Sequence, residues 1–206
     1  MQKTPIWVDI DTQVDFVLPH GKLYVPQAEQ IIPNLRRLME CARREGILVL
    51  SSADAHPPDD PSFEQWPPHC VEGTEGQERI PETQFETSWV LPNRPGCYSQ
   101  LPTPLPPQVI LEKQDYDISS NPNFDPLLER LGERDFFLFG VATEYCVVSA
   151  GLALRRRGKN VHLITDAIRA ISEEGGRKAI DQMCEAGVAL RSTEEVLAAR
   201  RSAVGK

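Results

Sequence analysis

The sequence predicts an α/β fold in which a parallel sheet carries helices on both faces. Three observations support it: short apolar, β-prone runs alternate with segments of helical spacing, glycines follow several helical segments, and polar residues follow several of the runs. Strands that alternate with helices favour parallel pairing through right-handed crossovers. Active sites of such sheets lie at the carboxyl ends of the strands, so the residues that follow each strand are the first functional candidates.

Each expected strand is a short apolar run that is rich in β-prone residues. The runs lie at residues 6–10, 47–50, 109–111, 136–141, 161–164 and 188–190. The expected helices have apolar residues at helical spacing, which is clearest for residues 31–44. They lie at residues 31–44, 147–157, 174–185 and 194–201, and Gly46, Gly158 and Gly187 follow the first three.

Residues 53–108 interrupt this alternation. The stretch is rich in proline, glycine and acidic residues and has almost no periodicity. A connection of that length within a compact domain is usually functional or disordered, and its clusters of histidine, aspartate and tryptophan favour function. We therefore expect one domain over residues 1–206 with a long active-site insertion at about 53–108. Whether the proline-rich residues 92–107 form a lid is open at this point.

The composition argues against several classes of function. The 206 residues have a hydrophobic content of 40% and a net charge of −8, without the basic surface that nucleic acid requires. No apolar stretch approaches the ~20 residues of a membrane span, and the first residues lack the apolar region of a signal peptide. Five cysteines at scattered spacings suit a reducing compartment. We expect a cytoplasmic protein that binds neither nucleic acid nor membrane.

Cys146 closely follows the expected strand 136–141. The apolar run ends at Gly140, Thr143 can act as the N-cap of the next helix, and Glu144 suits its first turn. Cys146 would then lie in that turn, where unpaired N–H groups and the helix dipole favour a thiolate and can hold an oxyanion. The alternative is a buried structural cysteine, which is the commoner case for a cysteine taken alone.

Two charged residues are expected beside this sulfur. Asp11 follows the first strand and Lys113 follows the third, so strand ends bring Asp11, Lys113 and Cys146 to one edge of the sheet. The lysine would lower the pKa of the thiol and the aspartate would accept its proton, which makes a base-assisted nucleophile. Taken alone, Asp11 could instead be an aspartate that only caps a loop, and Lys113 could be a solvated charge on the surface.

A second cluster of polar residues lies within 53–70. Two imidazoles and several carboxylates in this stretch could bind a borderline divalent metal such as Zn, Fe or Mn. Asp54 and His56 alternate just beyond the second strand, so their side chains can point the same way. The alternative is a charged surface loop whose histidines bind no metal. Cys70, next to the apolar Val71, suits packing better than ligation.

These motifs resemble those of the nicotinamidase branch of the isochorismatase-like cysteine hydrolases. Asp11-x-Gln-x-Asp15-Phe16 is similar to that family's first catalytic motif, Lys113 falls where the triad lysine is expected, and Gly140-Val-Ala-Thr-Glu-Tyr-Cys146-Val is similar to the nucleophile motif. The metal-binding loop is matched by Asp54-Ala-His56-Pro, Ser62-Phe63 and Trp66-Pro-Pro-His69-Cys70-Val-x-Gly73-Thr74-x-Gly76. The match runs in chain order from about residue 6 to residue 166.

The resemblance implies a three-layer α/β/α fold with a six-stranded parallel sheet, usually assembled as a homo-oligomer. It implies a catalytic triad of Asp11, Lys113 and Cys146, with the cysteine as nucleophile. It also implies a cis peptide bond between Val141 and Ala142. In the family this bond turns the N–H of Ala142, together with that of Cys146, toward the substrate oxyanion.

The resemblance also implies residues for the substrate and for a metal. Phe16 and Trp66 match positions that usually pack around the substrate ring, and Tyr145, next to the nucleophile, is a further substrate-binding candidate. The metal would be divalent, zinc in the first place, with iron or manganese as alternatives. The implied ligands are Asp54, His56 and His69.

Three departures from the family pattern affect the site. Many nicotinamidases have a third histidine where this chain has Asp60, so Asp60, or Glu64 slightly further on, becomes the candidate fourth ligand. An additional carboxylate favours harder ions. Ser-Asn-Pro-Asn-Phe at 120–124 replaces Tyr-Ser-x-Phe, which alters the pocket wall, and Glu144 stands where aspartate is common. The first two departures leave the exact substrate open.

The expected reaction is hydrolysis of nicotinamide to nicotinate and ammonia through a thioester on the cysteine. The nearest alternative is a metal-independent cysteine amidohydrolase of the same superfamily, acting on a carbamoyl, ureido or maleamate-type substrate. A metallohydrolase whose metal-bound water attacks the substrate is also open, as is a binding or redox-sensing module without catalysis. The chain has no G-x-S-x-G, P-loop or G-x-G-x-x-G motif.

Overall fold

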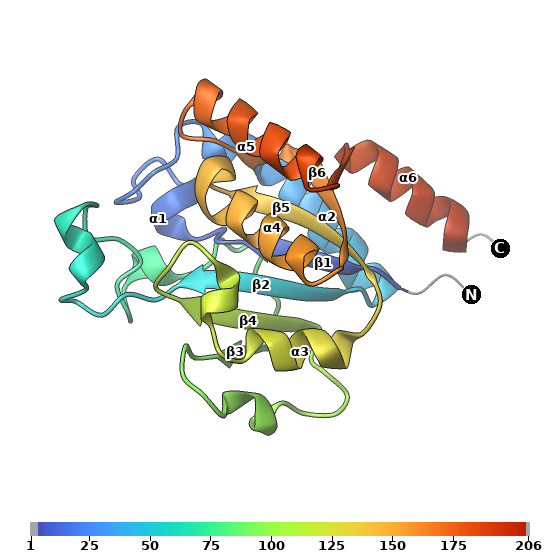
Figure 1. Ribbon diagram of the computed structural model, residues 1–206, viewed down its shortest axis with the longest axis horizontal. Coiled ribbons are helices and arrows are strands. Elements are labelled where there is room, and N and C mark those ends of the chain that lie inside the picture. Colours follow the sequence, from blue (N-terminus) through green and yellow to red (C-terminus); the bar gives the residue numbers. More distant parts are fainter. Residues whose placement is uncertain (1–3, 205–206) are drawn as a thin grey trace.

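One parallel sheet organises residues 4–204, the part of the chain that the computed structural model describes. In sheet order its seven strands are β3 (Ser88–Leu91), β4 (Gln108–Lys113), β2 (Leu48–Asp54), β1 (Ile6–Ile10), β5 (Asp135–Val141), β6 (Asn160–Arg169) and β7 (Ala189–Arg191). All neighbouring strands in this order pair in parallel (Figure 1). The predicted parallel sheet is confirmed.

The prediction of six strands is wrong, because β3 forms a seventh. This strand has four residues and pairs with β4 at the edge of the sheet, where Val90 is 44% exposed. It lies within the proline-rich and acidic residues 53–108, and no long apolar run marks it. The insertion therefore adds a strand to the sheet as well as loops.

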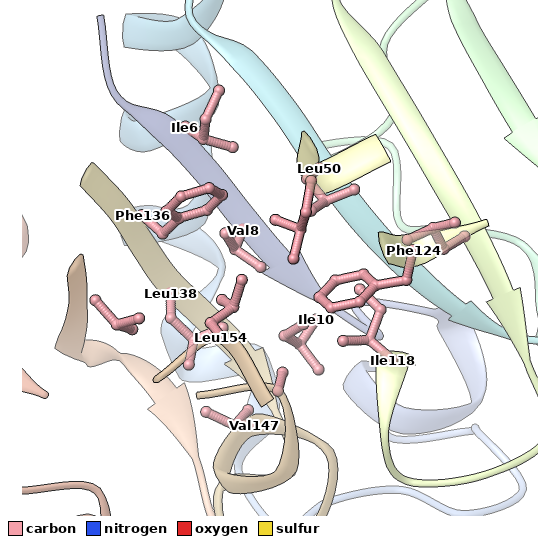
Figure 2. Close-up of a cluster of buried hydrophobic side chains, with 14 of the residues drawn as sticks. Ile6, Val8, Ile10, Leu50, Ile118, Phe124, Phe136, Leu138, Val147 and Leu154 are labelled. Carbon is pink, nitrogen blue, oxygen red and sulfur yellow. The ribbon is translucent and has the colours of Figure 1, made fainter. Parts of the chain in front are cut away.

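Helices cover both faces of the sheet. The first face carries α3 (Phe124–Leu131), α4 (Val148–Arg156) and α5 (Glu173–Glu185), and the second carries α2 (Ile32–Glu45) and α6 (Thr193–Val204) (Figure 1). Side chains alternate along β1, so Ile6, Val8 and Ile10 enter the first core while Trp7 enters the second. Figure 2 shows the first core, in which Phe124 of α3 packs close to the strand residues.

The long helices follow from their sequences. Helix α2 buries one apolar stripe, including Leu35 and Leu38, and ends at Gly46, which has the left-handed φ of 64° that glycine adopts readily. The hydroxyl of Ser172 accepts the N–H of Gly175 and so caps α5. The shorter helical segments are α1 (Val14–Val17), η1 (Ala28–Ile31), η2 (Pro61–Glu64), η3 (Glu75–Gln77), η4 (Cys97–Gln100), η5 (Ile118–Ser120) and η6 (Thr143–Val147).

Residues 92–107, the proline-rich part of the insertion, pack beside α3. Cys97 and Leu101 are buried in the first core, and the N–H of Tyr98 donates to Oδ1 of Asn123 at 2.8 Å. The guanidinium of Arg130 on α3 donates to the carbonyl of residue 102 at 2.6 Å. These contacts assign the segment to the wall of the core rather than to a lid.

The carboxyl ends of β1 and β5 approach each other closely. Gly140 has a φ of 118°, and a Cβ at this position would overlap the carbonyl oxygen of Ile10. Only glycine fits there, because it lacks the Cβ and tolerates positive φ. The close approach brings Asp11 beside the turn that carries Cys146. No helix in residues 4–204 has the length and apolar character needed to cross a membrane.

Candidate active site and metal-binding cluster

Three candidate residues meet at the carboxyl edge of the sheet. Asp11 directly follows β1, Lys113 ends β4, and Cys146 lies in the π-helical turn η6 between β5 and α4. Nζ of Lys113 lies 2.9 Å from Oδ2 of Asp11 and 3.5 Å from Sγ of Cys146. These groups are distant in the sequence, and the strand ends bring them into contact.

Burial and ion pairing set the charge of Lys113 and Asp11, which are both fully buried. Burial opposes the charge on Lys113, but the carboxylates of Asp11 and Asp54 outweigh it and raise the pKa of the lysine well above its usual value. Lys113 is therefore an ammonium. Burial also raises the pKa of Asp11, against the opposing effect of Lys113. A carboxylate with a raised pKa is a better proton acceptor.

The sulfur of Cys146 is a thiol in the free protein. Burial raises the pKa of Cys146 well above its usual value, although Lys113 acts in the opposite direction. Lys113 lowers this pKa, as expected, but burial outweighs its effect and the carboxylates of Asp11 and Asp54 also act against it, so the expected net lowering of the pKa is wrong. A nucleophilic attack by this sulfur therefore needs a partner that takes its proton.

The turn around Cys146 differs from the expected helix start. Thr143 begins the π-helical turn and is buried, whereas Ala142 occupies the capping position without a side-chain hydrogen bond. Helix α4 begins only at residue 148, so the prediction of Thr143 as N-cap is wrong. The peptide bond between Val141 and Ala142 is cis, which confirms the prediction from the resemblance.

Glu144 ties this turn to the start of α5. Its carboxylate accepts the N–H of Ile171 at 3.0 Å and the N–H of Ser172 at 2.9 Å. Hydrogen bonds from two backbone groups to one ionised carboxylate are among the stronger contacts in a protein. The turn that carries Cys146 is thereby fixed to the start of α5, which follows β6 in the chain and packs against α4.

Asp54, His56 and His69 form a buried cluster of the metal-binding type. One ligand atom from each lies within 4.8 Å of the others. Nε2 of His56 and Nε2 of His69 lie 3.6 and 3.8 Å from Oδ2 of Asp54. Nδ1 of His69 contacts the carbonyl of Pro67 at 2.8 Å, which leaves its Nε2 facing the centre. An outer hydrogen bond of this kind is what orients a histidine that binds a metal.

The two candidate fourth ligands lie in different places. Oδ2 of Asp60 is 3.0 Å from Nδ1 of His56, on the side of the ring away from Asp54, although the geometry falls short of a well-aligned hydrogen bond. Asp60 also accepts the N–H of Ser62 and so caps η2. Glu64 is exposed and outside the cluster. The structure therefore places Asp60 behind His56 rather than at the centre.

A small cavity of about 50 Å³ adjoins the sulfur of Cys146. The expected substrate-binding residues Phe16, Trp66 and Tyr145 all line it, and the ring of Phe16 packs against that of His69 with centroids 5.4 Å apart. Sequence reasoning missed the other wall residues, since nothing in their local sequence marks them. These are Leu23, Val25, Tyr116, Val141 and Ile171.

Comparison with known proteins shows the family of the chain. The family model described as Isochorismatase domain matches residues 6–100 and 95–195 of the chain. The chain belongs to the isochorismatase family. It is 25% identical over 209 residues to a nicotinamidase of Acinetobacter baylyi, covering 91% of this chain and 92% of the relative. It is 26% identical over 214 residues to a nicotinamidase of Schizosaccharomyces pombe, covering 93% and 94%.

One structurally similar protein was solved with a bound metal. The pyrazinamidase of Pyrococcus horikoshii in complex with zinc is 27% identical to this chain and superposes with a TM-score of 0.76. The match covers 92% of this chain and 99% of that one. The α/β fold with its parallel sheet therefore matches that of the pyrazinamidase over nearly all of this chain.

Two buried side chains support the site in this isochorismatase-family chain, and the motif analysis gave neither a role. The hydroxyl of Ser52 donates to Oδ1 of Asp11 at 2.6 Å. The amide of Gln13 pairs with the backbone of Asp54, accepting its N–H at 2.7 Å and donating to its carbonyl at 2.8 Å. Gln13 therefore joins the end of β1 to the residue of β2 that belongs to the metal-binding cluster.

Asp15, the second aspartate of the first family motif, has a structural position. Its carboxylate accepts the N–H of Lys22 at 2.8 Å and the N–H of Cys70 at 2.7 Å. Cys70 directly follows His69, so this contact fixes one histidine of the cluster to α1. The segment Asp11-x-Gln13-x-Asp15 thus places Asp11 beside Lys113 and supports the metal-binding cluster through Gln13 and Asp15.

Proposed function

We propose that the protein hydrolyses the carboxamide of a planar heteroaromatic ring, with nicotinamide as the substrate and nicotinate and ammonia as the products. One observation carries the proposal: Nζ of Lys113 lies 2.9 Å from Asp11 and 3.5 Å from the sulfur of Cys146, at an apolar cavity lined by aromatic rings. The matches to nicotinamidases over about nine-tenths of the chain support an amidase and this substrate class.

A divalent metal fits the cluster of Asp54, His56 and His69. Two imidazole nitrogens and one carboxylate oxygen face one another, and Pro67 and Asp60 lie against the outer nitrogens of the rings. We propose zinc, with iron or manganese as alternatives, and the zinc complex of the related pyrazinamidase supports this choice. When bound, the metal supplies a Lewis-acidic position beside the cavity that can hold a ring nitrogen of the substrate.

In the proposed first step, Cys146 attacks the carboxamide carbon. The ring lies between Phe16 and Trp66, Asp11 takes the thiol proton, and the sulfur forms a bond to the carbon. The N–H groups of Ala142 and Cys146 hold the resulting oxyanion, an effect worth roughly 3 kcal/mol per donor. Lys113 stays protonated and stabilises the negative charge as it passes from sulfur to substrate oxygen.

In the proposed second step, the intermediate collapses and water completes the hydrolysis. The carbon–nitrogen bond breaks, Asp11 gives its proton to the leaving nitrogen, and ammonia departs from a thioester on Cys146. Asp11 then accepts a proton from water, whose oxygen attacks the thioester carbon. The carbon–sulfur bond breaks, the thiol of Cys146 is restored with the proton from Asp11, and the acid product leaves and loses its proton to water as nicotinate. A homo-oligomeric assembly, a cytoplasmic location and the absence of nucleic-acid binding stay predictions.

Ammonia release from nicotinamide tests the proposal in three proteins: the wild type, Cys146→Ala, and Cys184→Ala as a control at an exposed cysteine. We expect turnover in the wild type and in Cys184→Ala, and none in Cys146→Ala at unchanged zinc content. Substantial turnover in Cys146→Ala would reject the covalent route. A wild type that is inactive on nicotinamide but active on ureido acids or maleamate after metal removal would instead support the metal-independent alternative.

A further inference from the structure

Two cavities meet at the candidate active site. The apolar cavity adjoins Cys146, and a second, larger and more open cavity of about 380 Å³ has a polar part of its wall that includes Ser62, Gln65, Gln114 and Asp115. Four residues line both cavities and so form the boundary between them. They are Asp54, Trp66, His69 and Tyr116. Two of them belong to the metal-binding cluster, and the two aromatic residues make the rest of the wall.

The aromatic part of this wall is held together by a hydrogen bond. Nε1 of Trp66 donates to the hydroxyl of Tyr116 at 2.9 Å. Both rings also pack against Tyr145, with centroids 5.6 Å apart for Trp66 and 5.3 Å apart for Tyr116. Trp66 comes from the loop that carries His69, whereas Tyr116 follows shortly after Lys113. The contact therefore joins the loop of the metal-binding cluster to the strand of the triad.

Tyr116 is the least buried part of this wall. Its side chain is 43% exposed, one of the highest values among the large apolar and aromatic residues of the described chain. Its ring is therefore held mainly by its contacts with Trp66 and Tyr145 rather than by the core. A residue in that position can be changed without disturbing the sheet, yet its removal would open the apolar cavity into the polar one.

We propose that Tyr116 is a specificity-determining residue: with its hydrogen bond to Trp66 it closes the apolar cavity and limits the substrate to an amide on a single ring. The polar cavity beyond it would receive a ring substituent once the wall is removed. The inference rests on the proposed function for the reaction at Cys146. The size limit itself depends only on access to that sulfur, so it can be tested apart from the reaction.

The first experiment measures access to Cys146 with two maleimides that share one chemistry and differ in size. N-methylmaleimide and N-(1-pyrenyl)maleimide are compared by site-resolved mass spectrometry, with the exposed Cys184 as the reference in the same sample. We expect Tyr116→Ala to raise the ratio of large-reagent to small-reagent rates at Cys146 at least tenfold, with no change at Cys184. A ratio at Cys146 within twofold of the wild type overturns the proposal.

Two further variants serve as comparisons. One distinguishes the effect of the Tyr116 ring from that of its hydroxyl, and the other controls for the loss of an exposed apolar side chain. Tyr116→Phe keeps the ring and removes the hydrogen bond to Trp66. We expect it to raise the ratio of large-reagent to small-reagent rates at Cys146 about twofold to threefold. If the ratio rose as much as in Tyr116→Ala, the hydrogen bond to Trp66 would be what keeps the apolar cavity closed, and this result would also support the proposal. Val90→Ala changes another exposed apolar residue, which lies on edge strand β3 and lines neither cavity, and should leave the ratio unchanged.

The second experiment uses turnover of nicotinamide and of 5-phenylnicotinamide. We expect Tyr116→Ala to lower kcat/KM for nicotinamide about tenfold, chiefly through KM, and to raise kcat/KM for the larger amide at least tenfold. Equal turnover of both amides by the wild type overturns the size limit. If the wild type hydrolyses no amide, the proposed function fails, and the maleimide rates alone decide the role of Tyr116.

Discussion

Replacing Gln13 with alanine should weaken the metal-binding cluster as well as the fold. The Gln13 amide makes three hydrogen bonds: two with the backbone of Asp54, at 2.7 and 2.8 Å, and one to the carbonyl of Gln77, at 2.8 Å. Each bond contributes about 1 kcal/mol, so Gln13→Ala should lower the free energy of unfolding by about 3 kcal/mol. Asp54 would also lose the contacts that hold its backbone against the end of β1.

A second glutamine offers a matched control. Gln108 is also fully buried and makes three hydrogen bonds, donating to Ser51 and to the carbonyl of Thr83 and accepting the N–H of Phe85, each at 2.9 Å. It begins β4, at the end of the strand away from the site. Gln108→Ala should therefore cost about as much stability as Gln13→Ala, about 3 kcal/mol, without reaching the metal-binding cluster.

Two measurements on both variants test this reasoning. Urea unfolding gives the change in stability, and zinc competition against a chelator gives the metal affinity. Loss of a residue that supports a metal ligand typically costs tenfold to a hundredfold in affinity, and we expect such a loss in Gln13→Ala only. Equal zinc affinities in the two variants, at equal stability, would refute the argument that Gln13 positions the cluster.

Three further predictions concern single residues. The rate of Cys146 alkylation by iodoacetamide should rise steadily from pH 7 to pH 9, because the raised pKa keeps the thiolate a minor form there, and a plateau below pH 8 would contradict it. Asp60→Asn should weaken zinc binding about tenfold and Glu64→Gln should leave it unchanged, as measured by chelator competition. Gly140→Ala should lower Tm much more than Gly46→Ala, since only at residue 140 would the new Cβ meet backbone atoms.

The sequence was informative wherever a local pattern has one structural meaning. Short apolar runs identified the central strands, and the rule for parallel sheets then indicated that residues at their carboxyl ends lie together. Asp11, Lys113 and Cys146 could be grouped in this way without any measure of distance. The separation of Asp54 and His56 by one residue was likewise enough to predict that their side chains converge.

The sequence was least informative where tertiary contacts decide. Strand β3 has four residues at an edge, so neither length nor apolar content distinguished it from the surrounding loops. The raised pKa of Cys146 depends on burial and on how fully Lys113 is already paired, which no motif encodes. Tyr116 follows Lys113 in an irregular segment, and its place in the cavity wall depends on a hydrogen bond to a distant loop.

Asp54 makes the triad and the metal-binding cluster a single charged unit. Strands β2 and β4 pair Asp54 with Lys113 in register, so Oδ1 of the carboxylate meets the ammonium while Oδ2 faces the two histidines. Asp54 shares the ammonium of Lys113 with Asp11, and against the effect of burial it also raises the pKa of His56, so its carboxylate favours positive charge at the histidines. The pairing that keeps Lys113 charged beside the sulfur therefore also favours a metal ion at the histidines.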